Sequence, residues 1–313
     1  MRITIILLWV TCCATPAAAQ TRFEYSEIAM GVCARIVLYA SDRASADSAA
    51  LDAYKRIAQL EDIMSDYRPG SELMRLCKKA GGPPVQVSPD LYYVLDKCQE
   101  LARRSDGGFD CTVGPLVKLW RAARKSGTLP DSSDLEDARK LTGWRLMRVP
   151  AACDKPGFVQ LMRTGMLLDL GGIAKGYACD EALKTLRSRG IKSALIEMGG
   201  DIAVGDPPPG KNGWQIDVAN APSPKTVSLK NAAISSSGDV EQYIEIDGKR
   251  YSHIVNPKTG LGLTDRIAVT VVAPNATTSD SLSTAISVLG ETRGKTLANT
   301  FAGVWVYVRR AGG

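Results

Sequence analysis

An aspartate and a threonine near the C-terminal end of the chain have the spacing of a hard-cation site. Asp280 and Thr284 are four residues apart, which places them about 40° from each other around a predicted helix. The apolar residues of this segment gather on the opposite face, and they are Leu282, Ala285, Ile286 and Leu289. A carboxylate and a hydroxyl placed in this way can share Mg²⁺, which prefers oxygen ligands. The alternative is that Asp280 only caps or solvates the start of the helix.

A glycine-containing loop over residues 169–177, with the sequence DLGGIAKGY, has the features of an anion site. Gly171 and Gly172 follow a predicted strand and precede a predicted helix, so free backbone N–H groups can hold phosphate there. Lys175 adds a positive charge. The glycine spacing matches neither a Walker loop nor a Rossmann fingerprint. The alternative is that the glycines form a tight turn and Lys175 is merely solvated.

The only histidine of the chain, His253, lies at the end of a predicted hairpin strand, before a turn. Catalytic side chains are often presented at such positions, although a lone histidine is more often structural. The nearby Lys258-Thr259-Gly260 matches the K-T-G of penicillin-binding enzymes, but the chain contains no S-x-x-K and no G-x-S-x-G. Serine-nucleophile enzymes of these two kinds are therefore excluded.

The elements that must position these groups follow from hydrophobic periodicity. Helical spacing predicts helices over residues 44–66, 91–103, 174–187 and 280–289. Alternating or short apolar runs predict strands, namely a pair over 23–39 around Met30-Gly31, then 166–170, 194–198, 202–204, 214–218, 267–273 and 304–308. Asp247-Gly248 predicts a hairpin within residues 243–255.

The first predicted helix should bury one apolar stripe, composed of Leu51, Tyr54, Ile57, Leu60 and Ile63. Helices and antiparallel strands alternate along the chain without a regular β-α-β order. This order favours an α+β fold with mixed or antiparallel sheets and interleaved helices, in a single domain of two lobes.

Composition narrows the class of protein. The chain has 313 residues, of which 45% are hydrophobic, enough for a sizeable core. The formal net charge of +6 is scattered rather than gathered into a basic stripe, so we expect no nucleic-acid partner. A single histidine excludes any site built on clustered histidine ligands.

The first 19 residues are predicted to be a secretory signal peptide. Arg2 precedes an apolar segment too short to span a bilayer, and Ala17-Ala18-Ala19 offers a small-x-small cleavage site. Residues 20–313 would then form the mature, exported domain, periplasmic and without a transmembrane segment. Lipid attachment at Cys12 or Cys13 is the less favoured alternative.

Six cysteines fall in the predicted mature chain, namely Cys33, Cys77, Cys98, Cys111, Cys153 and Cys179. Their even number in an oxidising compartment permits disulfides, although no C-x-x-C pair occurs and the connectivity cannot be deduced. Burial of several as small apolar side chains is equally consistent with the sequence.

Taken together, seven ordered motifs resemble the ApbE family, the FAD-dependent FMN transferases that flavinylate other proteins. The similarity runs from Met30 to about Gly290. The motifs are MSDYRPGSEL (64–73), GGFDCTVGPL (107–116) with Trp120, the 169–177 loop, EMGGD (197–201), SSGD (236–239), YSHIVNPKTG (251–260) and the segment 280–284. The resemblance implies an ApbE-like, T-fold-like domain.

The resemblance also implies roles for individual residues. Mg²⁺ would be held by Asp280, Thr284 and the backbone carbonyl of Gly172. His253 would assist catalysis as the base that takes a proton from the acceptor hydroxyl, and Lys175 would help to hold the phosphates. FAD would be contacted at eight positions, namely Met30, Tyr67, Gly108, Phe109, Asp110, Asp169, Lys175 and Ile254.

Two motif positions bear on activity. The tyrosine at position 67 resembles the residue that transferases of the family carry there, whereas members that hydrolyse FAD can carry asparagine at this position. Asn256 replaces an aspartate, which lowers the tendency of the neighbouring His253 to hold a proton. The family's acceptors carry Thr or Ser in an S/T-G-A-T/S-like motif on exported flavoprotein domains. The sequence leaves two alternatives, an Mg²⁺-dependent FAD pyrophosphatase that gives FMN and AMP, and a non-catalytic periplasmic protein that stores FAD.

Overall fold

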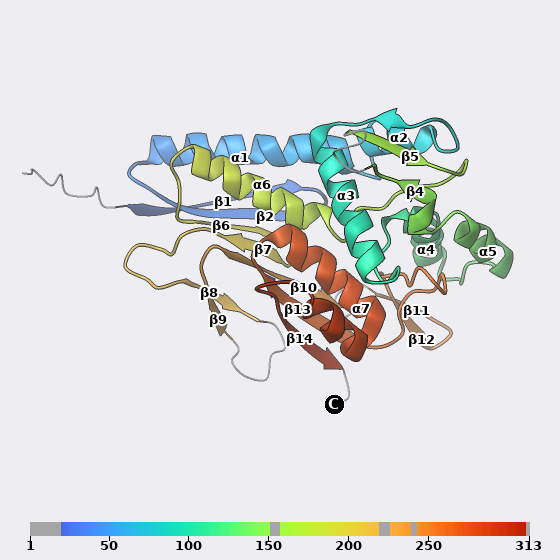
Figure 1. Ribbon diagram of the computed structural model, residues 1–313. Coiled ribbons are helices and arrows are strands. Elements are labelled where there is room, and N and C mark those ends of the chain that lie inside the picture. Colours follow the sequence, from blue (N-terminus) through green and yellow to red (C-terminus); the bar gives the residue numbers. More distant parts are fainter. Residues whose placement is uncertain (1–19, 151–156, 219–225, 239–242, 311–313) are drawn as a thin grey trace, which may run out of the picture.

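A computed structural model describes residues 20–150, 157–218, 226–238 and 243–310 of the chain. The predicted signal peptide, Cys153 and Asp239 lie outside the described residues. The prediction of an α+β fold is confirmed: one antiparallel sheet forms the framework, and helices are interleaved with its strands along the chain (Figure 1).

The central sheet has seven strands, and every neighbouring pair is antiparallel. Their order across the sheet is β1 (Thr21–Ala29), β2 (Val32–Ala40), β6 (Ala194–Met198), β7 (Asp201–Val204), β10 (Ala232–Gly238), β13 (Ile267–Ala273) and β14 (Trp305–Arg310). The register aligns Ser235 with Asp201. The β1–β2 turn, the β6–β7 turn and the end of β10 therefore meet at one end of the sheet.

Three helices cover one face of this sheet, namely α1 (Arg43–Met64), α6 (Ala174–Ser188) and α7 (Ala276–Ala298) (Figure 1). A fourth helix, α3 (Pro89–Arg104), packs against α1 and α7. The other face is covered by the hairpin of β8 (Trp214–Asp217) and β9 (Thr226–Leu229), whose Trp214 and Ile216 pack against Val37 and Ile234 of the sheet.

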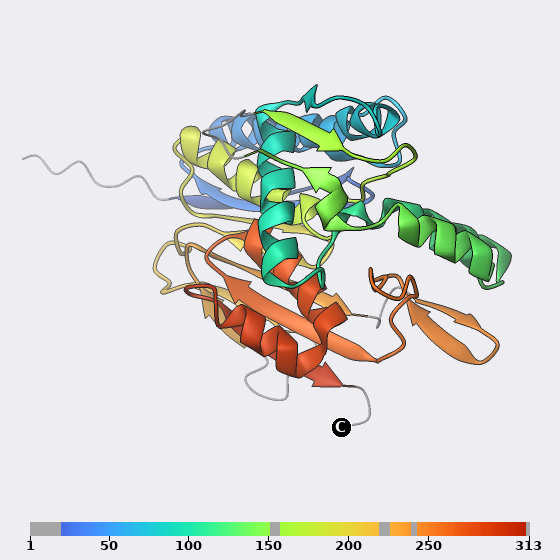
Figure 2. The ribbon, with the colours of Figure 1, turned by 45° about the vertical axis from the view of Figure 1, so that its right-hand side comes forward.

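A second, smaller lobe has its own core. It combines α4 (Gly114–Ser126), α5 (Ser132–Lys140) and the hairpin of β11 (Tyr243–Ile246) and β12 (Lys249–Ser252), which project together to one side (Figure 2). The buried Trp120 of α4 packs on Tyr251 of β12, with ring centroids 5.1 Å apart. This lobe confirms the expectation of two lobes.

The remaining elements connect the two lobes along the helical side. They are α2 (Glu72–Lys78), the strands β3 (Val85–Gln86), β4 (Met147–Arg148) and β5 (Phe158–Leu161), and the short 3₁₀ helices η1 (Cys111–Val113) and η2 (Trp144–Leu146). The three strands form a small sheet in the order β3, β5, β4.

Three local predictions were wrong. Residues 166–170 form no strand, because their backbone N–H groups bond outside any ladder: Asp169 N donates to the Cys111 carbonyl and Leu168 N to Cys77 Sγ. Leu51 is exposed, since alanines such as Ala50 and Ala53 form the buried stripe of α1.

The third error concerns the last helix, which is longer than predicted at both ends. It begins at Ala276, with Asn275 as its N-cap, and a backbone break at Gly290 (φ 76°, ψ 175°) interrupts it. Asp280 therefore lies in the second turn rather than at the cap, which removes the capping interpretation.

Five cysteines are described, and all are free thiols. Four of them, Cys77, Cys98, Cys111 and Cys179, are buried, in agreement with the interpretation as small apolar side chains; Cys33 is exposed. Within the described ranges, no helix is long and apolar enough to cross a membrane.

Candidate active site

The site is built where the start of α6 meets the start of α7. The Asp180 carboxylate on α6 accepts hydrogen bonds from Ala276 N and Thr277 N, both 2.8 Å long, and thereby fixes the first turn of α7. Gly176 allows the two helices to approach, because a Cβ at that position would lie 2.2 Å from the Ala276 carbonyl oxygen. The close approach places Asp280 directly over the first turn of α6.

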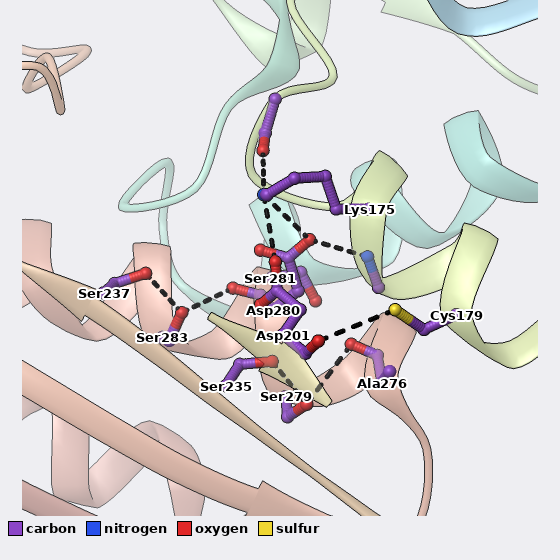
Figure 3. Close-up of polar contacts among 12 residues, drawn as sticks. Lys175, Cys179, Asp201, Ser235, Ser237, Ala276, Ser279, Asp280, Ser281 and Ser283 are labelled. Atoms are coloured by element: carbon purple, nitrogen blue, oxygen red, sulfur yellow. Dashed lines mark hydrogen bonds and ion pairs between the residues drawn. The ribbon is translucent and has the colours of Figure 1, made fainter. Parts of the chain in front are cut away.

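Asp280 and Lys175 meet in this junction, together with Asp201 from the start of β7 (Figure 3). Asp280 Oδ2 accepts a hydrogen bond of 2.9 Å from Gly176 N and lies 3.7 Å from Lys175 Nζ. Lys175 Nζ also lies 3.0 Å from Asp201 Oδ2 and donates to the Gly171 carbonyl at 3.1 Å. The ammonium group is therefore held inward by oxygen atoms and is not simply solvated.

Pairs of serine hydroxyl groups between β10 and α7 hold the part of α7 that carries Asp280 against the sheet (Figure 3). Ser235 and Ser279 are joined at 2.7 Å, Ser237 and Ser283 at 2.5 Å, and the Ser283 hydroxyl also donates to the Asp280 carbonyl. Because these short side chains hydrogen-bond to one another, the helix can lie close to the sheet without leaving their buried hydroxyl groups unpaired.

Thr284 and Gly172 complete an oxygen-rich corner beside Asp280. A Cβ added at Gly172 would lie only 2.9 Å from Thr284 Oγ1, so the loop backbone passes directly beside this hydroxyl. Unlike Ser281 and Ser287 of the same helix, Thr284 donates no hydrogen bond to another described residue. A carboxylate and a hydroxyl without a hydrogen-bond acceptor are oxygen donors of the kind that Mg²⁺ prefers, and the backbone of the glycine loop lies beside the hydroxyl.

Burial, followed by the charge of Asp201, raises the pKa of Asp280 to about 7, while Lys175 acts in the opposite direction. Between its ordinary pKa of 3.8 and about 7, the folded protein retains a proton that the unfolded chain has released. Stability of the metal-free protein should therefore fall as the pH rises through this range.

We expect the melting temperature in EDTA to drop by about 3 °C more in the wild type than in Asp280→Asn between pH 5.5 and 8, because the variant lacks this titration. Differential scanning fluorimetry measures the change. An equal drop in both proteins would assign the pH dependence to other groups.

Arg121 on α4 joins Tyr67 to the glycine loop, and sequence reasoning missed it. Its guanidinium donates to Asp66 at 2.5 Å and to Asp169 at 3.0 Å, and its Cζ lies 4.1 Å from the centre of the Tyr67 ring. Tyr67 itself is 74% exposed. Arg121 thus supports the exposed Tyr67 ring beside the loop, and a flavin or adenine ring can stack on that ring.

We expect Arg121→Met to raise the dissociation constant for FAD by about tenfold, because Tyr67 loses its support and two carboxylates lose their counter-charge. Flavin fluorescence titration measures the change. Arg124→Met is the matched control, since Arg124 is exposed one turn along the same helix. Equal effects of the two variants would contradict a positioning role for Arg121.

The 108–110 segment uses its side chains within the fold. Phe109 is buried in the main core, and Asp110 accepts hydrogen bonds from Thr112 N at 2.9 Å and Trp144 N at 2.7 Å. A Cβ at Gly108 would lie 2.7 Å from the Leu289 side chain. Any FAD contact by this segment would therefore be made mainly through its backbone.

The loop that carries His253 and Ile254 is fastened to α4 and also contacts Asp106. Trp120 Nε1 donates to the Gly260 carbonyl at 2.8 Å, and Lys258 Nζ lies 2.8 Å from Asp106 Oδ2. His253 is half-buried and Ile254 is buried. Helix α4 therefore contacts the histidine loop through Trp120 and the glycine loop through Arg121.

Met30 occupies the β1–β2 turn with φ 50°. The β6–β7 turn lies next to it, because a Cβ at Gly199 would be 2.9 Å from Val32. Asp201 begins β7 directly after that turn, so Met30 lies at the same end of the sheet as the Asp201 carboxylate.

A hollow of 1020 Å³ lies elsewhere, along α6 between α3 and the start of α7. Its central charged side chains are paired: Arg56 lies 2.5 Å from Asp90 and 2.6 Å from Glu181, and Tyr177 donates to Asp90. These contacts fasten α1, α3 and α6 together, so we interpret the hollow as structural.

Comparisons with known proteins agree with this geometry. The sequence model of the ApbE family matches residues 30–308. The chain belongs to the ApbE family. It is 32% identical to an FAD:protein FMN transferase of Treponema pallidum, over 96% of this chain and 88% of that protein.

Solved ApbE structures have the same fold. The apo flavinyl transferase ApbE of Pseudomonas stutzeri superposes with a TM-score of 0.82 at 27% identity, covering 94% of this chain and 92% of that one. The ApbE protein of Thermotoga maritima gives 0.82 at 30% identity, covering 94% and 96%. The expected ApbE-like domain is therefore confirmed.

The residues predicted from the ApbE motifs fall into three groups in the structure. Lys175, Asp280, Thr284 and Gly172 lie together at the α6–α7 junction. Tyr67 and Asp169 are joined through Arg121. The remaining six, Met30, Gly108, Phe109, Asp110, His253 and Ile254, lie on the turns and loops described above.

Sequence reasoning assigned no role to three side chains that shape the site, namely Arg121, Asp180 and Asp201. Asp201 ends the EMGGD motif and Arg121 follows the motif residue Trp120, so the sequence motifs could have pointed to both residues. Asp180 had none, because its role depends on the start of a helix almost a hundred residues later in the chain.

Proposed function

We propose that this ApbE family protein transfers FMN from FAD to a hydroxyl group of another protein and releases AMP. The observation that carries the proposal is the convergence of Asp280, Thr284 and Gly172 beside Lys175, in a chain that matches FMN transferases over almost its whole length. Mg²⁺ is the cation that this oxygen donor set fits, and it would stabilise negative charge on the diphosphate and on the leaving phosphate.

The residues around the junction suit the two ends of FAD. Lys175, in the first turn of α6, can bind the diphosphate, since a positive charge at a helix N-terminus favours anions. The exposed Tyr67 ring, supported by Arg121, offers a stacking face for the flavin or the adenine. Met30 and Ile254 would add apolar contacts from the turn and loop that carry them.

The reaction is a displacement at phosphorus. The acceptor oxygen forms a bond to the FMN-side phosphorus, the bond to the bridging oxygen breaks, and AMP leaves with that oxygen. His253 would take the proton from the attacking hydroxyl, because imidazole accepts protons near neutral pH. Positioning and charge neutralisation should supply most of the rate enhancement, as in other phosphoryl transfers.

Two alternatives keep the same site. A pyrophosphatase would use water in place of the acceptor hydroxyl and would give free FMN and AMP. A storage protein would bind FAD without reaction, but it would not need an oxygen-rich corner beside a buried carboxylate. Tyr67, which is similar to the residue of transferases, favours the first proposal.

The acceptor we propose carries Thr or Ser in an S/T-G-A-T/S-like motif on an exported flavoprotein domain. We also propose that the protein works in the periplasm after removal of residues 1–19, with lipid attachment as the less favoured alternative. Export of enzyme and acceptor to one compartment would bring them together.

A single experiment separates the three functions. The mature protein is mixed with FAD and MgCl₂, with and without an acceptor domain bearing the motif, and both intact acceptor mass and AMP are followed. A mass gain of one FMN that EDTA abolishes supports the transferase and the metal. AMP without labelling, for several acceptor domains, supports the pyrophosphatase, and bound FAD without either product supports storage.

A further inference from the structure

Lys175 is bound in the way that a metal cation would be bound. Its ammonium group lies 3.0 Å from Asp201 Oδ2, 3.1 Å from the Gly171 carbonyl oxygen and 3.7 Å from Asp280 Oδ2 (Figure 3). These oxygens come from three different parts of the fold, namely β7, the glycine loop and α7. The side chain is thus turned into the protein, although it begins in the first turn of α6.

Both carboxylates depend on this ammonium for charge balance. The side chains of Asp201 and Asp280 are 5% and 4% exposed, and Lys175 is the cation paired with both of them among the described residues. Buried carboxylates are stable as anions only when they are paired or coordinated. A second cation that binds to Asp280 would therefore meet a carboxylate that already has a partner.

We propose that Lys175 is the internal counter-cation of the metal-free site, and that it opposes metal binding at Asp280 until its ammonium group gives up that contact. The inference rests on the proposed function, because it requires a divalent cation at Asp280 and Thr284. It assigns Lys175 a role apart from phosphate binding: it keeps the carboxylates paired when no metal is bound, and it lowers the affinity for metal in the absence of FAD.

The charge arithmetic gives the direction of the effect. Asp201 and Asp280 together carry two negative charges when ionised, and the ammonium cancels one of them. Without the ammonium, the metal cation would meet the full negative charge of the carboxylate pair. It would also no longer be repelled by a positive charge only a few ångström away, a repulsion that is strong at a buried site. Removing Asp201 has the opposite effect, because Asp280 then becomes the remaining carboxylate partner of Lys175.

The test measures metal affinity rather than activity. Mn²⁺ is titrated into FAD-free, metal-free protein at pH 8, and free Mn²⁺ is followed by electron paramagnetic resonance. We expect Lys175→Met to bind Mn²⁺ at least about tenfold more tightly than the wild type, within the usual range of coupling between sites. Asp201→Asn should bind it more weakly. Lys175→Arg, which keeps the charge, should remain within about threefold of the wild type.

Lys184→Met is the matched control, since Lys184 lies on the same helix with a side chain that is 75% exposed. Equal or weaker Mn²⁺ binding by Lys175→Met, with circular dichroism like that of the wild type, would overturn the proposal. If Lys175→Met fails to fold without metal, the comparison of Asp201→Asn with the wild type decides, and unchanged affinity overturns the proposal. Absence of Mn²⁺ and Mg²⁺ binding by the wild type would instead contradict the metal site of the proposed function.

Discussion

Replacement of Asp280 by alanine is expected to reduce AMP release and acceptor labelling by about a thousandfold or more. Asp280 supplies the carboxylate of the proposed metal site, and loss of a metal that stabilises transition-state charge costs several kcal/mol. The same carboxylate also holds Gly176 N and lies 3.7 Å from Lys175 Nζ, so the start of α6 loses an anchor. Chromatography of AMP and intact mass of the acceptor measure the effect.

Two further variants isolate the charge of Asp280. Asp280→Asn keeps the size of the side chain but not its charge, so it should lose nearly as much activity. Glu291→Gln removes a carboxylate from the same helix that lies 2.7 Å from Lys295, and it should behave like the wild type. Retention of more than a tenth of the activity by Asp280→Asn would contradict a metal role, and retained FAD binding without AMP would separate catalysis from storage.

Hydrophobic periodicity was enough to predict most of the fold, because most elements bury a regular stripe or alternate across a sheet. The β1–β2 pair, α3, α6 and the 243–252 hairpin all lie where the sequence placed them. Residues 166–170 show the limit of this method. Met166, Leu168 and Leu170 alternate inward as in a strand. However, the backbone N–H groups of Leu168 and Asp169 donate to Cys77 and Cys111, which no local pattern could indicate.

The candidate site could be predicted only in part, for a similar reason. The spacing of Asp280 and Thr284 indicated a shared ligand, and the structure places Gly172 beside Thr284. The helical wheel also placed these two residues opposite the core face, yet Asp280 is buried because α6 covers that face. The inward direction of Lys175 follows from Asp201 and α7, which are distant in sequence, so solvation was the simpler expectation.

Replacement of His253 by alanine is expected to lower turnover by about a hundredfold to a thousandfold, while the dissociation constant for FAD stays within about threefold of the wild type. A general base contributes to the transition state but little to binding of the ground state, so the two constants should separate. His253 lies on a loop that Trp120 fastens to α4, so its removal should leave the loop in place. Single-turnover labelling and flavin fluorescence measure the two quantities.

The pH dependence and chemical rescue distinguish a base from a structural histidine. Turnover of the wild type should fall with decreasing pH as the imidazole becomes protonated, whereas the residual turnover of His253→Ala should lack that step and should rise when imidazole is added. Lys258→Gln is the matched control on the same loop, since its ion pair with Asp106 is exposed and contributes little. Loss of FAD binding by His253→Ala, without rescue by imidazole, would make the histidine a structural element of the loop, and the acceptor hydroxyl would then lose its proton to another group or to solvent.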